Sequence, residues 1–140
     1  MTLPRRTLAP AFLAGVVGLC PVGPASAHHS FAMFDPAKVV TLKGTVTEFD
    51  WSNPHVSMTV AVPQPSGAAP EVWTVELTSP GNLGRVGWTR HSIKPGDRVA
   101  VDVNPLRDGK HGGGFRQVTL IDSGKVLGGS LRDLESKAPK

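Results

Sequence analysis

The sequence predicts an all-β domain: a small OB-like barrel of five to six strands that follows a cleaved signal peptide. Apolar and polar residues alternate over several short runs rich in β-branched residues, whereas apolar residues at helical spacing are scarce. Stretches rich in Gly and Pro separate these runs. Five runs, a long bent first one and a connector with a helical turn after the third match the partly open Greek-key barrel of OB folds. A small β-sandwich is the alternative.

Residues 1–27 have the pattern of an export signal. An Arg-Arg pair opens it, an almost wholly apolar run follows over residues 8–19, and Ala25-Ser26-Ala27 supplies the small residues that signal peptidase requires. Cleavage would make His28 the N-terminus of a periplasmic or secreted protein. The arginine pair leaves twin-arginine export open beside the ordinary unfolded route. No stretch approaches the roughly 20 apolar residues of a spanning helix, so we expect no membrane span.

The mature chain is expected to form one domain. Taking 27 residues from 140 leaves 113, enough for a single small core. We assign the barrel to residues 28–127 and a polar tail to residues 128–140. The only cysteine, Cys20, lies in the signal, so disulfides, thiolate metal sites and Cys nucleophiles are excluded from the mature chain.

The charge of the mature chain gives little reason to expect nucleic acid as a partner. The chain has 15 basic and 11 acidic residues, and two of the arginines leave with the signal. The 13 that remain give a formal charge of only +2 before the histidines, and export removes the protein from cytoplasmic nucleic acid.

The first strand is predicted over residues 39–51. Four residues share one face: Val40, Leu42, Gly44 and Val46. Phe49 and Trp51 have the opposite parity, which predicts a bulge or bend near Thr47-Glu48. Gly44 would allow another backbone to approach closely.

Two more strands follow, separated by a Pro/Gly/Ala loop over residues 63–70. Their predicted inner faces are Val56, Met58, Val60 and Val62 in the second strand, and Trp73, Val75 and Leu77 in the third. Residues 79–97 break the β pattern, with a helical turn expected around residues 82–86 and a Pro-Gly turn at Lys94-Pro95-Gly96-Asp97.

The last strands enclose a run of glycines. The fourth has Val99, Val101 and Val103 on its inner face. Residues 104–114 are predicted as a mobile, glycine-loaded hairpin loop, and residues 115–121 as the fifth strand. Val126 and Leu127 could extend the sheet. Phe31 and Phe34, which precede the first strand, are expected to plug one end of the barrel.

Several motifs resemble a group of small exported bacterial proteins that form an uncharacterised family, a domain of unknown function. They are HHSFAMFD, GTVTEFDWSNPH, the WTVEL strand, GNLGRVGW and IKPGDRV. The likeness covers essentially the whole mature chain, and the HHS start and the WSNPH segment are its most specific parts. It implies an exported β-domain and brings no assigned activity or functional residues.

The two histidines at the expected N-terminus suggest a copper site. An N-terminal histidine can chelate Cu(II) through its α-amino and imidazole nitrogens, and one further imidazole completes a T-shaped histidine brace. Such a site resembles those of periplasmic copper carriers and copper polysaccharide monooxygenases. Tetragonal nitrogen ligation suits Cu(II), which also heads the affinity order of divalent metals. His28 would supply two nitrogens and His55 the third, with His29 as a substitute. The alternative is that His28 and His29 form a frayed polar start and that His55 is a turn residue that caps local backbone.

Other candidates carry weaker signals. Trp51, Asn53 and Trp88 are the candidates for a ligand-binding groove, with core or rim packing as the alternative. His91 and His111 are expected to be exposed bystanders. No Gly-x-Ser-x-Gly elbow is present and no carboxylate is visibly placed to orient a base, so we expect no enzyme.

Two classes of function follow. The first is an exported copper-binding or copper-carrier protein that uses the N-terminal brace, with copper as its only cofactor. The second is a non-catalytic OB-like module that binds a protein or a small ligand on its barrel. Nucleic-acid binding is not expected, since basic and aromatic residues are not interleaved on a predicted surface.

Overall fold

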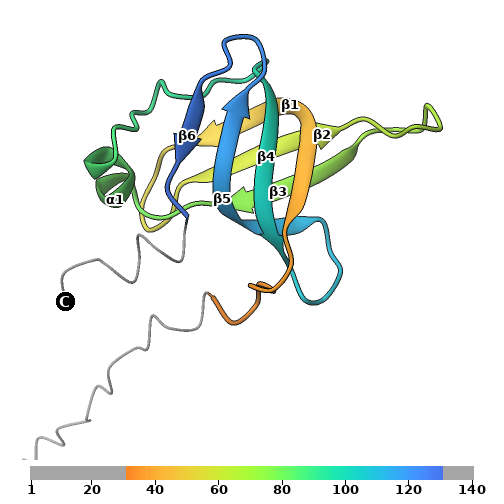
Figure 1. The fold of residues 1–140 in the computed structure, drawn as a ribbon, viewed down its shortest axis with the longest axis horizontal. Coiled ribbons are helices and arrows are strands. Elements are labelled where there is room, and N and C mark those ends of the chain that lie inside the picture. The colour runs from red at the N-terminus through yellow and green to blue at the C-terminus, as the bar shows by residue number, and fades with distance from the viewer. Residues whose placement is uncertain (1–30, 131–140) are drawn as a thin grey trace, which may run out of the picture.

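A computed structural model describes residues 31–130, which form six strands and one short helix (Figure 1). The elements in chain order are β1 (Val40–Asp50), β2 (Ser57–Val62), β3 (Glu71–Glu76), α1 (Pro80–Arg85), β4 (Arg98–Pro105), β5 (Gly112–Leu120) and β6 (Val126–Gly128).

The strands form a closed barrel. Their order is β3-β2-β1-β4-β5-β6, every neighbouring pair is antiparallel, and a parallel pairing of β3 with β5 closes the ring of five. The closing register places Thr74 opposite Gly112 and Glu76 opposite Gly114. β6 lies outside this ring and extends the sheet along β5. The predicted OB-like fold of five to six strands is therefore confirmed, and the sandwich alternative is not.

β1 bends to serve both sides of the barrel. Its first half pairs with β4 and its second half with β2, and the register with β2 shifts between Val46 and Glu48, at the predicted bulge. Gly44 lies beside β2, where an added Cβ would meet the carbonyl group of Ala61 and lie 3.0 Å from Cγ1 of Val60. A side chain at position 44 is thus excluded by the neighbouring backbone, as the sequence predicts.

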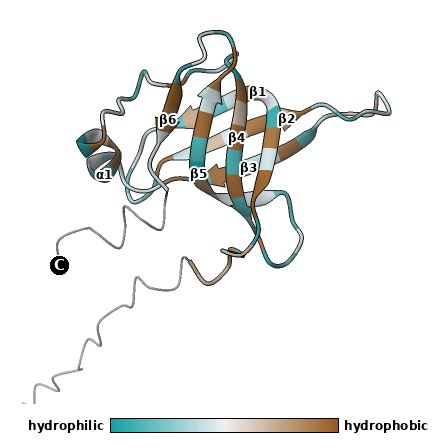
Figure 2. Cartoon of the chain, viewed as in Figure 1, coloured by the Kyte–Doolittle hydropathy of each residue, from teal (hydrophilic) through white to brown (hydrophobic). Residues whose placement is uncertain are grey.

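The core fills the barrel with the inward residues of each strand. Figure 2 shows the alternation of hydrophobic and hydrophilic positions along the strands. The predicted inner residues are buried: Leu42, Val46, Val56, Met58, Val60, Val75, Leu77, Val99, Val101 and Val103 are each at most 3% exposed. Trp73 and Val62 pack against this core while remaining partly exposed. Met58 is therefore a core residue.

The connector between β3 and β4 holds the single helix of the described residues close to its predicted place. Ser79 caps α1 by accepting a hydrogen bond from the backbone N–H of Asn82, a proline begins the first turn, and Leu83 is buried in the core. The Lys94–Asp97 turn forms as expected, with Gly96 at φ 94° and the Asp97 N–H donating to the Lys94 carbonyl.

The glycine run corrects one prediction, since Gly112 to Gly114 belong to β5 and not to a mobile loop. An added Cβ on Gly112 would lie 2.6 Å from Leu106 Cδ1, and one on Gly113 would lie 2.8 Å from Val103 Cβ. One on Gly114 would lie 3.0 Å from the Phe34 ring. The run therefore permits close packing on both faces of an ordered strand.

Phe34 also differs from its expected role. Its side chain is buried, at 6% exposed, but it lies outside the main core cluster. Its ring covers Gly114, whereas the neighbouring Gly113 faces Val103 inside the barrel. Because successive residues of a strand face opposite sides, Phe34 packs on the face of β5 opposite to the one that meets Val103.

The predicted signal peptide and most of the polar tail lie outside the described residues. β6 contains Val126 and Leu127, so the extra strand that the sequence allowed is present and ends one residue beyond the predicted domain boundary. Between residues 31 and 130, no helix is long and apolar enough to cross a membrane.

Candidate functional site

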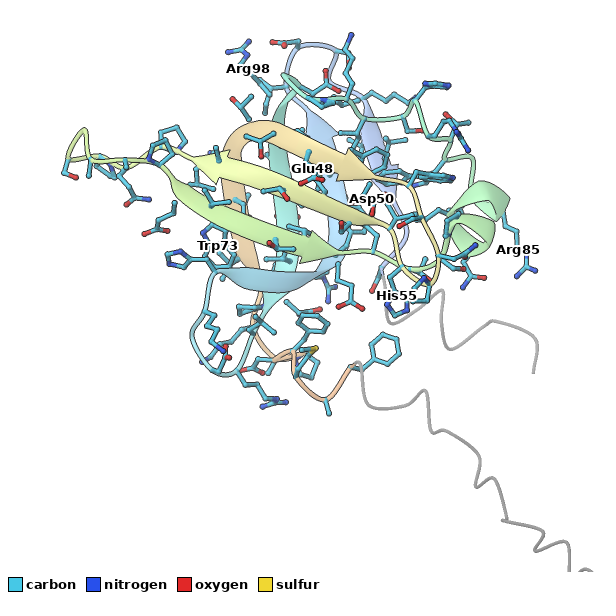
Figure 3. The ribbon with its side chains drawn as sticks, turned by 180° about the vertical axis from the view of Figure 1, so that it is seen from behind. Glu48, Asp50, His55, Trp73, Arg85 and Arg98 are labelled. Atoms are coloured by element: carbon cyan, nitrogen blue, oxygen red, sulfur yellow. The ribbon has the colours of Figure 1, made fainter. Side chains whose placement is uncertain are left out.

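His55 is paired with a carboxylate at one end of the barrel. Its Nδ1 lies 2.6 Å from Oε1 of Glu76, and the two side chains are 26% and 29% exposed. A contact of this length places a proton on Nδ1, donated to the carboxylate. Figure 3 shows His55 beside the end of β3, on the same side of the molecule as α1.

Backbone hydrogen bonds fix both members of this pair. His55 is in the loop between β1 and β2, and the next residue, Val56, is fully buried. The N–H of Val56 donates to the Thr78 carbonyl at 3.1 Å, and the N–H of Leu77 donates to the Val56 carbonyl at 2.8 Å. These bonds tie the loop to the segment that directly follows Glu76, so the imidazole and the carboxylate are held on adjacent rigid backbones.

The segment before β1, which begins at Phe31, lies on the same outer surface as Glu76. The segment before β1 is held against the end of β4, since the Arg107 N–H donates to the Met33 carbonyl and the Asp35 N–H donates to the Pro105 carbonyl. Met33 and Phe34 line a hollow of about 270 Å³ together with Glu76 and His111. The chain therefore enters the barrel alongside the carboxylate that holds His55.

A second histidine cluster occupies the other end of β3, which Figure 3 shows at Trp73, away from His55. The His111 ring stacks on Trp73 with centroids 5.2 Å apart and planes 17° from parallel. Oε2 of Glu71 lies 3.6 Å from His111 Nε2 and accepts a hydrogen bond from the Trp73 indole at 3.3 Å. Sequence reasoning missed this cluster, because only the parallel pairing of β3 with β5 brings its residues together.

The hairpin that carries His111 is ordered by its own contacts. Asp108 accepts hydrogen bonds from the backbone N–H and the ammonium group of Lys110, and the backbone bond is the main reason that the pKa of Asp108 lies below its usual value. The Thr74 N–H donates to the His111 carbonyl. His111 is 47% exposed at its side chain, as expected, and it lies directly before β5.

The three residues predicted to bind a ligand have different surroundings. Trp88 is 2% exposed, and its indole N–H donates to the Gly128 carbonyl at 2.8 Å, so its ring is enclosed in the core. Trp51 is half-buried against Phe49, with ring centroids 6.0 Å apart. Asn53 is exposed in the loop that carries His55. A surface role is thus open to Trp51 and Asn53, whereas burial argues against one for Trp88.

The predicted brace can be placed only in part. His28 and His29 lie outside the described residues, and His91 is exposed in a turn. Within residues 31–130, no three His, Asp or Glu side chains are grouped as a ready-made metal site. Of the predicted brace residues, the described part of the chain contains His55, with Glu76 as its partner.

The chain belongs to a family of unknown function, DUF6152, whose model matches residues 17–115. The match includes the entry segment and the barrel as far as the first half of β5, and it ends before the rest of β5 and β6. A search of curated proteins and a search of solved structures each find no match.

Proposed function

We propose that this protein is an exported, non-catalytic binding protein that holds a copper ion between its mature N-terminus and His55. His28 would supply its α-amino and imidazole nitrogens, and His55 would supply the third nitrogen. His29 is the alternative second histidine. The observation that carries the proposal is the His55–Glu76 pair, which lies where the chain enters the barrel.

Glu76 prepares His55 for a ligand role. Because Nδ1–H donates to the carboxylate, the neutral ring carries its lone pair on Nε2. Metal-binding histidines commonly donate their other ring N–H to a carboxylate, which fixes the tautomer and ring orientation and makes the ligand nitrogen more basic. The pair therefore fits an imidazole ligand better than a solvated histidine, whose ring would rotate freely.

The covalent length of the chain allows a mature N-terminus at His28 to reach toward His55. His28 is three residues before Phe31, so the two backbones can be separated by at most roughly 10 Å. A series of contacts connects the segment that begins at Phe31 with His55. Phe34 packs on Gly114, Gly114 is the strand partner of Glu76, and Glu76 contacts His55. Adjacent strands are separated by only about 5 Å.

Copper is the preferred metal because of the ligand set. One amine and two imidazoles are nitrogen donors that suit tetragonal Cu(II), and the mature chain has no thiolate to favour zinc or an iron–sulfur cluster. Each of these nitrogens binds only when deprotonated, so we expect the affinity to fall as pH is lowered.

Substitutions at the described half of the site test the proposal. In a protein that starts at His28, His55→Ala should weaken Cu(II) binding by at least about tenfold, and Glu76→Gln should weaken it by about 10- to 100-fold through loss of orientation. His91→Ala is the matched control, since it removes an exposed histidine from another turn. Isothermal titration with a competing chelator measures the affinities, and electron paramagnetic resonance counts the nitrogen ligands.

Equal affinities for the His55→Ala, His91→Ala and unmodified proteins would contradict the proposal. Function would then fall to the second class, a non-catalytic module that binds a protein or small ligand on its barrel.

A further inference from the structure

A second hollow, of about 280 Å³, shares Phe34 with the one that Glu76 lines. Its walls are mostly apolar, with Phe31 and Phe34 from the entry segment and Phe115 from β5. Ala32, Pro36 and Gly114 complete the apolar part, and Asn104 and Arg107 are the polar members. The volume is close to the lower end of the range of small-molecule sites, about 300–1,000 Å³.

One guanidinium group lines this hollow, and a second contacts one of its lining residues. Arg107 lines it, and Nε of Arg107 donates to the Ala32 carbonyl at 3.2 Å, which fixes the base of the group and leaves Nη1 and Nη2 as further donors. Nη1 of Arg116 lies 3.4 Å from Oδ1 of Asn104, another lining residue. Among residues 31–130, neither arginine is paired with a carboxylate.

The other polar groups at this hollow are already engaged. Asn104 donates from Nδ2 to the Lys38 carbonyl at 2.6 Å while its Oδ1 faces Arg116. Asp35, next to Phe34 in the chain, contacts the ammonium of Lys38 and the N–H of Ala37. Asn104 therefore has its polar groups already bonded within the protein. The charge left to contact a ligand is the positive charge of the arginines.

We propose that this hollow binds a small organic carboxylate whose body is aromatic or aliphatic. The apolar part would lie against Phe31, Phe34 and Phe115, and the carboxylate would accept hydrogen bonds from Arg107 at the rim, with Arg116 adding positive charge. Guanidinium groups favour carboxylates because their paired N–H donors match the two oxygens. The site uses neither His28 nor His55, so it stands independently of the proposed copper site.

Phenylacetate and its uncharged analogue phenylacetamide form a matched pair of probes. Titrations of the full chain, processed as its host processes it and kept free of metal with EDTA, can be followed by ¹⁵N–¹H NMR. Phenylacetate should shift the amides of Phe34, Gly114 and Phe115 saturably, at concentrations up to about 10 mM. Phenylacetamide should bind at least tenfold more weakly.

Variants separate the charge from the shape of the hollow. Arg107→Gln and Arg116→Gln should each weaken phenylacetate by at least about fivefold and leave phenylacetamide unchanged, and Arg90→Gln, an exposed arginine in a turn, should change neither. Ala32→Leu should block both probes by filling the hollow. Because Arg107 also holds Ala32, Arg116→Gln keeps the test valid if Arg107→Gln loosens the segment.

Equal binding of the two probes, or shifts that both arginine variants leave unchanged, would overturn the proposal. So would the absence of any saturable shift at these residues.

Discussion

At the scale of single residues, the chain contains two carboxylates whose partners give them different tasks. Glu76 is partly buried and contacts a histidine, so it can direct a ring nitrogen toward a ligand. Asp122 is 64% exposed and accepts a hydrogen bond from Arg98, at the opposite end of the molecule from His55 (Figure 3). The Glu76–His55 pair suits a ligand-binding site. The Asp122–Arg98 pair joins the start of β4 to the turn that follows β5.

The Arg98–Asp122 pair predicts an altered titration. The hydrogen bond from Arg98, followed by its positive charge, holds the pKa of Asp122 below its usual value. A carboxylate with a lowered folded-state pKa contributes stability above its unfolded value of about 3.9 and loses it as pH falls through the folded value. Carboxyl-carbon NMR should give a higher midpoint for Asp122 in Arg98→Gln than in the unmodified protein. Identical midpoints would show that the pair does not persist in solution.

At the scale of elements, the start of β5 depends on three glycines that neighbours approach from both sides. Gly113 faces the interior, where an added Cβ would lie 2.8 Å from Val103 Cβ and 2.9 Å from the Asn104 carbonyl oxygen. These are a β-branched core residue and a backbone atom, neither of which can move aside easily. The parallel pairing that closes the barrel uses the same glycine opposite Val75.

Gly113→Ala should therefore destabilise the barrel. We expect a loss of about 1–3 kcal/mol in the free energy of unfolding, as for other overpacked cores. Gly84→Ala is the matched control, because position 84 is in α1 and an added Cβ there meets nothing within 4 Å. That control should be neutral or gain up to about 1 kcal/mol from better helix propensity. Urea denaturation measures both, and equal stabilities would contradict the packing described for β5.

The strands were predictable because burial on one face leaves a period of two in the sequence, visible in runs such as Val99 to Val103. The glycine run was not, because glycine signals both mobility and close approach, and the residues that approach it come from distant parts of the chain. His55 could be named as a candidate ligand from the sequence. Its partner Glu76 could not, because it comes from a distant part of the chain. The contact between them depends on how the loop after β1 is bonded to the end of β3.

At the scale of the whole molecule, closing the barrel brings together parts of the chain that are remote in sequence. The entry segment, the loop after β1 and the β3–β5 junction meet at one end, where the Met33–Phe34 segment, His55 and Glu76 are located. The proposed copper site would use this end of the barrel, where His55 is held by Glu76. The proposed copper site requires that the free N-terminal amine takes part in binding.

That claim is tested most directly by moving the amine. Two proteins are compared, one beginning at His28 and one extended by a single glycine, with both N-termini established by mass spectrometry. The extension converts the histidine's amine to an amide and displaces the new amine by one residue. We predict that tight Cu(II) binding falls sharply, by at least about tenfold, in the extended protein at neutral pH, where the chelating nitrogens can deprotonate. Equal Cu(II) affinity in the two proteins would show that the N-terminal amine is not a ligand.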